Sequence, residues 1–323
     1  MPTTSQLAYE AVRNAAGVFE CTDIAVAAVS GNDRFTWLQG MISNDTRQLG
    51  SRTVRRLPAC ILDATGHVLS MITLTASQDL AAPLMLEAPK NGMSALLQHL
   101  DNYLITEDVT LEAVPMRVCA LQGPNAAAVL EKLDWDLRTA ATEADLTGSG
   151  GYSLVLEPAA ADLFFSTCVS LGVPTVDQDV QELLRIEAGI PLYGHDVDKG
   201  IIALEALLGP THISLGKGCY VGQEIIARID SRGHTNRALT GFVVDQSAAV
   251  ATGDKLFGDA EGGPELGWIT SVVASSPAAD GASIAMGYLR HEHRVAGTKL
   301  RTAGGVSITV GDLPFYLAAP TAE

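Results

Sequence analysis

The chain has 323 residues, 47% of them hydrophobic and 5% aromatic, with 37 acidic against 21 basic side chains and a formal charge of −16. This length is too great for one comfortable core and indicates two or three domains. The strongly acidic balance argues against nucleic acid or an anionic membrane as the main partner, because long-range repulsion opposes both.

The cysteines and the N-terminal segment indicate where the protein works. Five widely spaced cysteines with no C-x-x-C pair are typical of reduced intracellular thiols, not of a disulfide frame or a zinc site. The N-terminal segment has no signal-peptide pattern and is not rich in arginine. No apolar run reaches the roughly 18 residues that a membrane-spanning helix needs. We therefore expect a cytoplasmic protein without a metal site.

The first half of the chain contains two strand–turn–helix units. Helical spacing predicts a helix over 5–16, and the apolar run 24–29 predicts a strand followed by a turn and a helix. The same arrangement returns at 118–133. Aligning Gly31 with Gly123 makes the units either related halves or independent β–α units that each need a turn.

A hairpin is predicted between these two units. Residues 55–63 and 67–75 flank the turn Ala64-Thr65-Gly66, as the two strands of a hairpin would. The glycine-rich stretch 147–151 and the region around Gly216 fit neither of the common nucleotide-binding fingerprints, which we therefore reject. Further predicted elements are strands at 84–87 and 152–157 and helices at 93–102, 158–171 and 176–188.

The densest group of polar side chains lies at 215–237, LGKGCYVGQEIIARIDSRGHTNR. The run after Gly222 can open a helix, so Cys219 would lie between Lys217 and a helix N-terminus, where a thiol ionises readily. The alternative is that Cys219 is a small buried hydrophobe. Four basic and two acidic residues make 217–237 a locally positive segment, which is either an anion site or a solvated face.

A second informative stretch is RIEAGIPLYGHD at 185–196. Glu187 lies where a predicted helix ends, just before glycine and proline. A carboxylate there can accept two parallel hydrogen bonds from an amidine-like group such as that of a pterin. The alternative is a surface ion pair with a neighbouring arginine.

Beyond Arg237 the chain becomes rich in short β segments, which predict a small antiparallel barrel or sandwich. His291-Glu292-His293 could place two imidazoles on one face of a strand, but no third ligand is apparent and no metal site is predicted. The expected strands are 238–244, 255–257, 266–273, 283–289, 299–301 and 306–310.

The segment 217–224, KGCYVGQE, resembles the K-G-C-Y-x-G-Q-E signature of the YgfZ family of folate-binding proteins. That family includes mitochondrial iron–sulfur assembly factors and is related to the glycine-cleavage aminomethyltransferase, to whose R-x-E-A-G-x-x-x-Y-G-x-D pattern 185–196 is similar. The resemblance covers nearly the whole chain. It implies an α+β fold shaped as a three-lobed cloverleaf around tetrahydrofolate, with two intertwined α+β subdomains over 1–236 and an antiparallel β-barrel over 237–323.

The resemblance also implies roles for individual residues. Glu187 would hold the pterin ring, and Cys219 would be the functional thiol. Lys217 would keep that thiol ionised or contact the glutamate tail of the folate. Gln223 and Glu224 would fix the loop by hydrogen bonds to its backbone. The remaining expected site residues are Tyr193, Asp196, Arg228 and Arg237 around the cofactor and Gly218, Tyr220 and Gly222 in the motif loop.

One departure from the aminomethyltransferases shapes the functional hypothesis. Their hairpin carries an aspartate that acts on the folate nitrogen, and here Ser70 and Met71 stand in that place. Neither can exchange a proton at neutral pH as a carboxylate can. The leading hypothesis is a tetrahydrofolate-binding protein that serves iron–sulfur cluster assembly or repair by acting on client proteins. Alternatives are a folate-dependent aminomethyl transferase or N-methyl amine oxidising enzyme, with Asp63 as the nearest replacement acid, and a scaffold that has lost folate binding.

Overall fold

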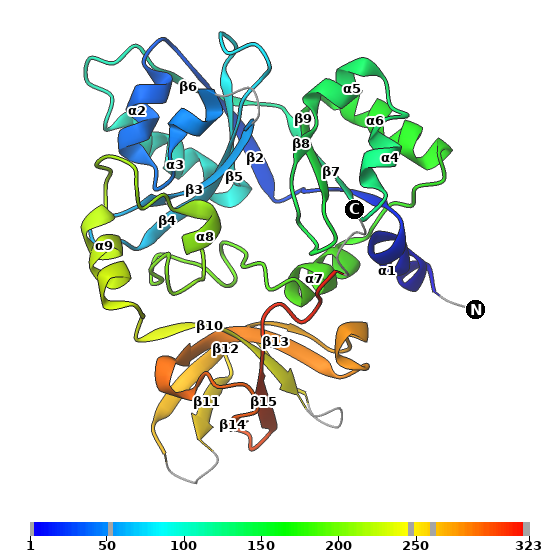
Figure 1. The fold of residues 1–323 in the computed structure, drawn as a ribbon, viewed down its shortest axis with the longest axis vertical. Helices are drawn as coiled ribbons and strands as arrows, with labels where there is room; N and C mark the ends of the chain where they lie inside the picture. The colour runs from blue at the N-terminus through cyan, green and yellow to red at the C-terminus, as the bar shows by residue number, and fades with distance from the viewer. Residues whose placement is uncertain (1–2, 51–53, 245–248, 259–262, 319–323) are drawn as a thin grey trace.

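The molecule has three lobes (Figure 1). Two lobes of mixed helix and sheet lie side by side, and a β-barrel lies below them. The computed structural model describes residues 3–50, 54–244, 249–258 and 263–318. The expected α+β class and C-terminal antiparallel barrel are confirmed.

The first lobe is an antiparallel sheet of order β3-β4-β5-β2-β6. The predicted hairpin is its β3–β4 pair, and a core that includes Leu38, Ile42 and Leu74 fills the space between sheet and helices. The elements are β2 (Ile24–Ser30), α2 (Arg34–Met41), η1 (Thr46–Gly50), β3 (Arg56–Leu62), β4 (Val68–Thr75), β5 (Leu84–Pro89), η2 (Lys90–Gly92), α3 (Met93–Asp101) and β6 (Thr110–Val114).

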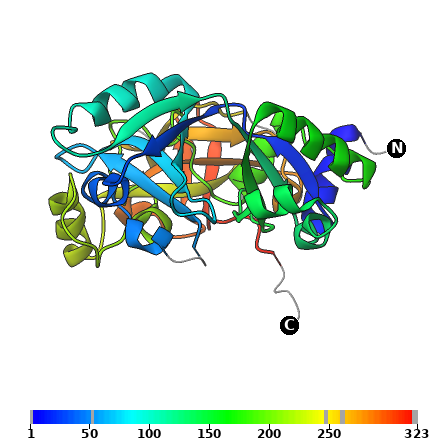
Figure 2. The ribbon, with the colours of Figure 1, turned by 90° about the horizontal axis from the view of Figure 1, so that it is seen from above.

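The second lobe is a sheet of order β1-β7-β9-β8. The chain starts in this lobe, crosses to the first lobe after β1 and returns with β7, so the two lobes are interleaved (Figures 1 and 2). The elements are α1 (Thr4–Asn14), β1 (Gly17–Glu20), β7 (Arg117–Gln122), α4 (Ala126–Leu130), α5 (Trp135–Ala140), β8 (Thr142–Glu143), β9 (Gly151–Leu156), α6 (Pro158–Ser170) and α7 (Gln178–Glu187).

The chain then passes through α8 (Gly209–His212) and α9 (Gln223–Arg232) before entering the third lobe at Arg237. The third lobe is a closed barrel of order β10-β13-β12-β11-β14-β15. Its elements are β10 (Arg237–Val244), β11 (Lys255–Gly258), β12 (Glu265–Val273), η3 (Pro277–Ala279), β13 (Ser283–Arg290), η4 (His291–His293), β14 (Lys299–Thr302) and β15 (Ser307–Gly311).

A shared core joins the lobes. One cluster of buried side chains draws Leu62 and Val68 from the hairpin, Ile186 from α7, and Met286 and Tyr288 from the barrel. Because apolar surface from separate lobes is buried in one cluster, the lobes cannot separate without exposing it to water.

The sequence patterns missed some elements and misplaced one. The sequences of the short strands β1, β6 and β8 and of the helix α5 have no strong hydrophobic periodicity. Their conformation is therefore set by the neighbouring strands and helices against which they pack. The suggestion that His291 and His293 share a face of a strand is wrong: β13 ends at Arg290, and the next three residues form the 3-10 turn η4. Gly31 and Gly123 both adopt a positive φ, as the turns of the two strand–turn–helix units require.

The barrel depends on a close approach of two strands at Gly287. A Cβ at this position would lie 2.1 Å from the carbonyl oxygen of Trp268. We expect Gly287→Ala to destabilise the protein by about 2–3 kcal/mol in urea unfolding, because backbone atoms on both sides cannot move aside. Gly258→Ala is the matched control, since its Cβ would meet only Leu266 at 3.8 Å. Equal stabilities of the two variants would contradict this account.

Candidate functional site

The loop that carries the K-G-C-Y signature is pressed against the turn of the β3–β4 hairpin. Gly222, the residue before α9, has φ 84°, and a Cβ there would lie 2.4 Å from the carbonyl oxygen of Asp63. Gly66 in the hairpin turn lies against Ile225 on the first turn of α9. The glycine at 222 is therefore required both by backbone conformation and by space, and the contact fixes where α9 begins.

Cys219 lies exposed in this loop, just before α9. Among the five cysteines, all within the described ranges, it alone is exposed. Burial raises the pKa of Cys21, Cys60 and Cys119 to about 12 and that of Cys168 to about 11. Those thiols are inert at neutral pH, which leaves Cys219 as the thiol that a partner can reach.

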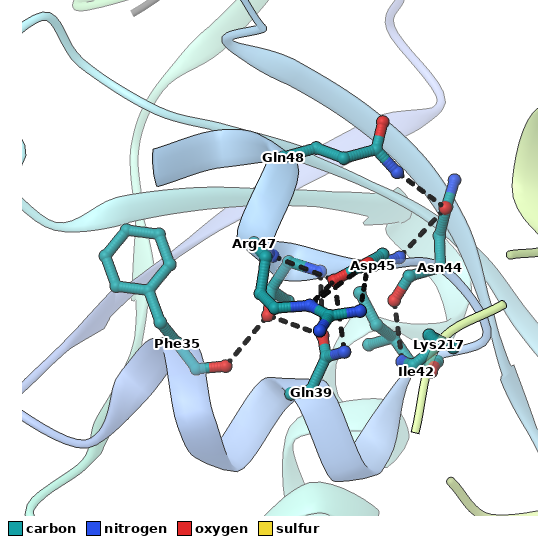
Figure 3. A network of polar contacts seen from close by, with 9 residues as sticks. Phe35, Gln39, Ile42, Asn44, Asp45, Arg47, Gln48 and Lys217 are labelled. Carbon is teal, nitrogen blue, oxygen red and sulfur yellow. Dashed lines mark hydrogen bonds and ion pairs between the residues drawn. The ribbon is translucent and has the colours of Figure 1, made fainter. Parts of the chain in front are cut away.

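Lys217 anchors the loop from the inside. Its Nζ donates hydrogen bonds to the carbonyl oxygens of Ile42 at 2.6 Å and Asn44 at 2.7 Å (Figure 3). The same atom lies 4.9 Å from the centre of the Tyr220 ring. Burial lowers the pKa of Lys217 to about 8. The ammonium group thus points into the α2–η1 connection, and no contact with Cys219 is seen in the described part of the chain.

The α2–η1 connection that receives Lys217 is itself held rigid. Asp45 accepts hydrogen bonds from Gln39 at 3.1 Å and from Arg47 at 2.7 Å (Figure 3). The hydrogen bond from Arg47 is the main cause that lowers the pKa of Asp45 to about 2. The Asn44 amide donates to Thr211 at 3.0 Å, which ties the connection to α8. The signature loop therefore rests on a prearranged polar support.

The other expected residues of the signature segment divide by exposure. Gln223 accepts a hydrogen bond from the backbone N–H of Tyr220 at 3.3 Å, the loop-fixing contact expected of it. Glu224 and Arg228 lie exposed on α9. Arg237 is engaged: it pairs with Glu205 at 3.0 Å and lies over the Trp268 ring at 4.8 Å. The guanidinium of Arg237 is therefore less available to a ligand than that of the exposed Arg228.

Glu187 is fully enclosed at the end of α7. Its carboxylate accepts hydrogen bonds from Arg13 at 2.5 Å, Tyr9 at 3.0 Å, Ser276 at 2.5 Å and the N–H of Ala278 at 3.3 Å. Burial is the main cause that raises the pKa of Tyr9 to about 12. The position is thus buried and ion-paired, not the surface pair that the sequence left open.

Arg13 is a site residue that sequence reasoning missed. Its guanidinium also donates to Ser149 at 2.8 Å and stacks over the Tyr316 ring at 3.6 Å. These partners lie far apart along the chain, so no local sequence pattern predicts the contacts. The sequence does place Arg13 next to Val12, on the side of the amphipathic helix that is buried. A charged residue there usually has a buried partner.

Tyr193 and the hairpin meet in the shared core. The Tyr193 hydroxyl donates a hydrogen bond to the carbonyl oxygen of Leu69. Met71, Tyr193, Tyr220 and Trp268 are partly buried side chains around this core, so aromatic surface stays accessible there. The structure thereby brings the hairpin, the signature loop and Tyr193 together, whereas the contacts of Glu187 are with α1 and the β12–β13 connection.

The hairpin offers no free acid in the described structure. Ser70 is buried and donates to the carbonyl oxygen of Met71 at 3.1 Å. Burial opposes ionisation of Asp63, but hydrogen bonds from Thr65 and His67 outweigh it and lower the pKa of this carboxyl. Asp63 thus stabilises the hairpin turn through these hydrogen bonds.

Asp196 is likewise a structural carboxylate. It is 1% exposed and accepts hydrogen bonds from Arg185 at 2.7 Å and Ser271 at 2.7 Å. These contacts join the segment after α7 to strand β12 of the barrel. Asp196 therefore holds the lobes together beside the site and does not line it.

Comparisons with known proteins agree with this architecture. Residues 3–147 match the family model described as the GCVT N-terminal domain. Among solved structures, the chain is similar to the glycine cleavage system aminomethyltransferase T from Bartonella henselae, with a TM-score of 0.83 and 24% identity over 97% of this chain and 89% of that one. This chain therefore has the fold of that aminomethyltransferase.

No helix in the described part of the chain is both long and apolar enough to cross a membrane. Within the same ranges, no three His, Cys, Asp or Glu side chains are grouped so that they could hold a metal ion.

The buried lysine makes a prediction about stability and pH. The pKa of Lys217 is about 8 in the folded chain and 10.5 in its ordinary state, so between these values the unfolded chain binds more protons. Stability conferred by this residue therefore rises with pH across that window, by up to about 3 kcal/mol at 1.36 kcal/mol per pKa unit. Urea unfolding at pH 7 and pH 10 should show this rise in the parent relative to Lys217→Met.

Lys299→Met supplies the control, because Lys299 is exposed and donates a hydrogen bond to the Thr309 hydroxyl, its one partner among the described residues. It should keep the pH dependence of the parent. The same pH dependence in the parent and in Lys217→Met would show that burial of this ammonium group costs nothing.

Proposed function

We propose that the chain binds a reduced folate where its lobes meet and uses Cys219 to assemble or repair iron–sulfur clusters in client proteins. The observation that carries the proposal is the setting of Cys219, an exposed thiol on a loop fixed from within by Lys217 and from behind by the hairpin turn. A reactive thiol on a rigid support can meet a partner protein in one defined geometry. The resemblance of 217–224 to the YgfZ signature supports the same role.

Folate binding is supported by the fold and by the chemistry near the shared core. The aminomethyltransferase T fold is matched over nearly the whole chain. Partly buried Tyr193 and Tyr220 supply aromatic surface of the kind that stacks on a planar ring. The exposed guanidinium of Arg228 suits a carboxylate of the glutamate tail.

We expect the pterin to replace two of the hydrogen-bond donors that now contact the Glu187 carboxylate. Two of its present donors, the Ser276 hydroxyl and the Ala278 N–H, come from a single segment, the β12–β13 connection. A pterin offers two neutral N–H donors of its own, so it can replace this pair while Arg13 remains as the charge partner. The buried carboxylate then stays neutralised and fully hydrogen-bonded throughout.

A second candidate function is folate-dependent aminomethyl transfer, or oxidation of an N-methyl amine. The match to an aminomethyltransferase fold favours it. It requires a carboxylate that can act on the folate nitrogen, and Ser70, Met71 and the turn-bound Asp63 do not supply one. Release of formaldehyde or methylenetetrahydrofolate from an N-methylated amine by the purified chain would favour this candidate over the first.

The pterin assignment is tested by fluorescence titration with tetrahydrofolate. We expect Glu187→Gln to weaken binding by roughly ten-fold or more, because a charge-assisted acceptor is replaced by an amide. The matched control is Glu182→Gln, an acid on the same helix that pairs with Arg185. Circular dichroism verifies that both variants fold. If Glu187→Gln binds as tightly as the parent, Glu187 does not hold the pterin.

The role of the thiol is tested in a strain that lacks this chain. Complementation with Cys219→Ser should restore cluster-dependent enzyme activities no better than an empty vector, because the hydroxyl is neither an effective nucleophile nor a soft ligand. Cys168→Ser is the control, since that thiol is buried away from solvent. Tetrahydrofolate binding should be unchanged in Cys219→Ser. Full restoration by this variant would remove Cys219 from the mechanism.

A further inference from the structure

A small cavity lies at the end of α9 opposite the Cys219 loop. It has a volume of about 270 Å³, which is below the ~300–1,000 Å³ of pockets for drug-sized ligands. Its lining comes from three places: the segment before α8, the end of α9 with the turn that leads into β10, and η4 with the residue that follows it. The cavity therefore lies where the linking segment meets the barrel, apart from the hairpin and the signature loop.

Arg294 gives the cavity a cation without a counterion. Its Nε donates to the Thr240 hydroxyl at 3.0 Å and its Nη2 to the carbonyl oxygen of Leu239 at 3.1 Å, both neutral acceptors. Over the described ranges, Arg294 forms no ion pair. Burial lowers the pKa of this half-buried guanidinium. A partly desolvated cation in so acidic a protein ordinarily has a carboxylate beside it.

Asp230 gives the same cavity an anion without a counterion. It lines the cavity from the last turn of α9 and, in the described part of the chain, has no ion pair of its own. Two residues of opposite charge thus line one small space and do not form an ion pair with each other in the described chain. A ligand that carries both a carboxylate and an ammonium group would match both.

The rest of the lining is apolar or imidazole. Leu204 and Leu207 contribute the apolar part, and Leu207 is 43% exposed with a left-handed backbone, φ 60°. That conformation costs a leucine of order 1 kcal/mol. The rings of His234 and His291 stack with centroids 4.7 Å apart. Neither imidazole has a hydrogen-bond partner in the described chain, so both offer ring nitrogens to a ligand.

We propose that this cavity binds a free α-amino acid with a short aliphatic side chain. Arg294 and the two imidazoles receive the carboxylate, Asp230 receives the ammonium group, and Leu204 and Leu207 cover the side chain. This site is independent of the proposed folate site. It lies at the far end of α9, so its occupant would rest against the helix whose first turn supports Cys219.

Other ligand classes fit the same residues less well. A phosphate dianion would meet Asp230 and the negative end of the α9 dipole. A metal ion would meet Arg294, and no metal-ligating group of three side chains is found in the described ranges. A simple fatty acid would leave Asp230 unpaired.

Isothermal titration of the full chain with leucine tests the proposal. We expect a Kd of roughly 0.1–1 mM, in keeping with a ligand of few heavy atoms. Arg294→Gln and Asp230→Asn should each weaken leucine binding by roughly ten-fold or more. Asp230 is exposed, so Asp230→Asn tests the site without disturbing the barrel. Lys299→Gln, which lies outside the cavity lining, is the matched control and should bind as the parent does.

Two further probes separate the ligand classes. Leucine amide and 4-methylpentanoate each lack one of the two charges, so both should bind the parent at least ten-fold more weakly than leucine. Equal binding of 4-methylpentanoate and leucine, tighter binding of inorganic phosphate, or an unchanged affinity for leucine in Asp230→Asn would overturn the proposal. The proposal would also be overturned if no leucine binding were detected at a leucine concentration of about 10 mM, ten-fold above the upper limit of the expected Kd.

Discussion

A buried ion pair between Arg13 and Glu187 anchors the second lobe to the barrel. Removal of two charges from water is costly, and hydrogen bonds from Tyr9 and Ser276 to Glu187 and from Arg13 to Ser149 offset that cost. Tyr9, Ser276 and Tyr316 complete the cluster, so the N-terminal helix, α7, the barrel and the C-terminal segment all contribute to it. Loss of either charge would leave the other buried without an ionic partner, so the pair is a fixed anchor between the second lobe and the barrel.

A second buried charge, that of Lys217, plays the corresponding part for the signature loop. Its two carbonyl acceptors lie in the α2–η1 connection, which Asp45 and Arg47 hold in place. The loop therefore has little freedom, although Cys219 itself is exposed. Rigid support beneath an exposed reactive group is what a thiol needs to meet a partner protein in a defined orientation.

The fold and the local chemistry give different information about function. The chain has the fold of an aminomethyltransferase over nearly its whole length, but one fold hosts many activities and its site residues decide among them. Here the hairpin position that would need an acid holds Ser70 and Met71, while an exposed thiol stands on the adjacent loop. The proposed function therefore rests on the exposed thiol and not on an acid of the hairpin.

The sequence by itself determined the helices and strands with strong periodicity, the barrel and the signature loop, because these features depend on neighbouring residues. Gly222 is an example: its need for a positive φ could be inferred from the glycine-rich run and is met in the structure. The roles of Glu187 and Lys217 were assigned by resemblance, and their contacts could not be derived. Their partners Arg13 and Ile42 lie 174 and 175 residues away. Such pairings, like the cavity shared by Asp230 and Arg294, exist only once tertiary packing has brought distant segments together.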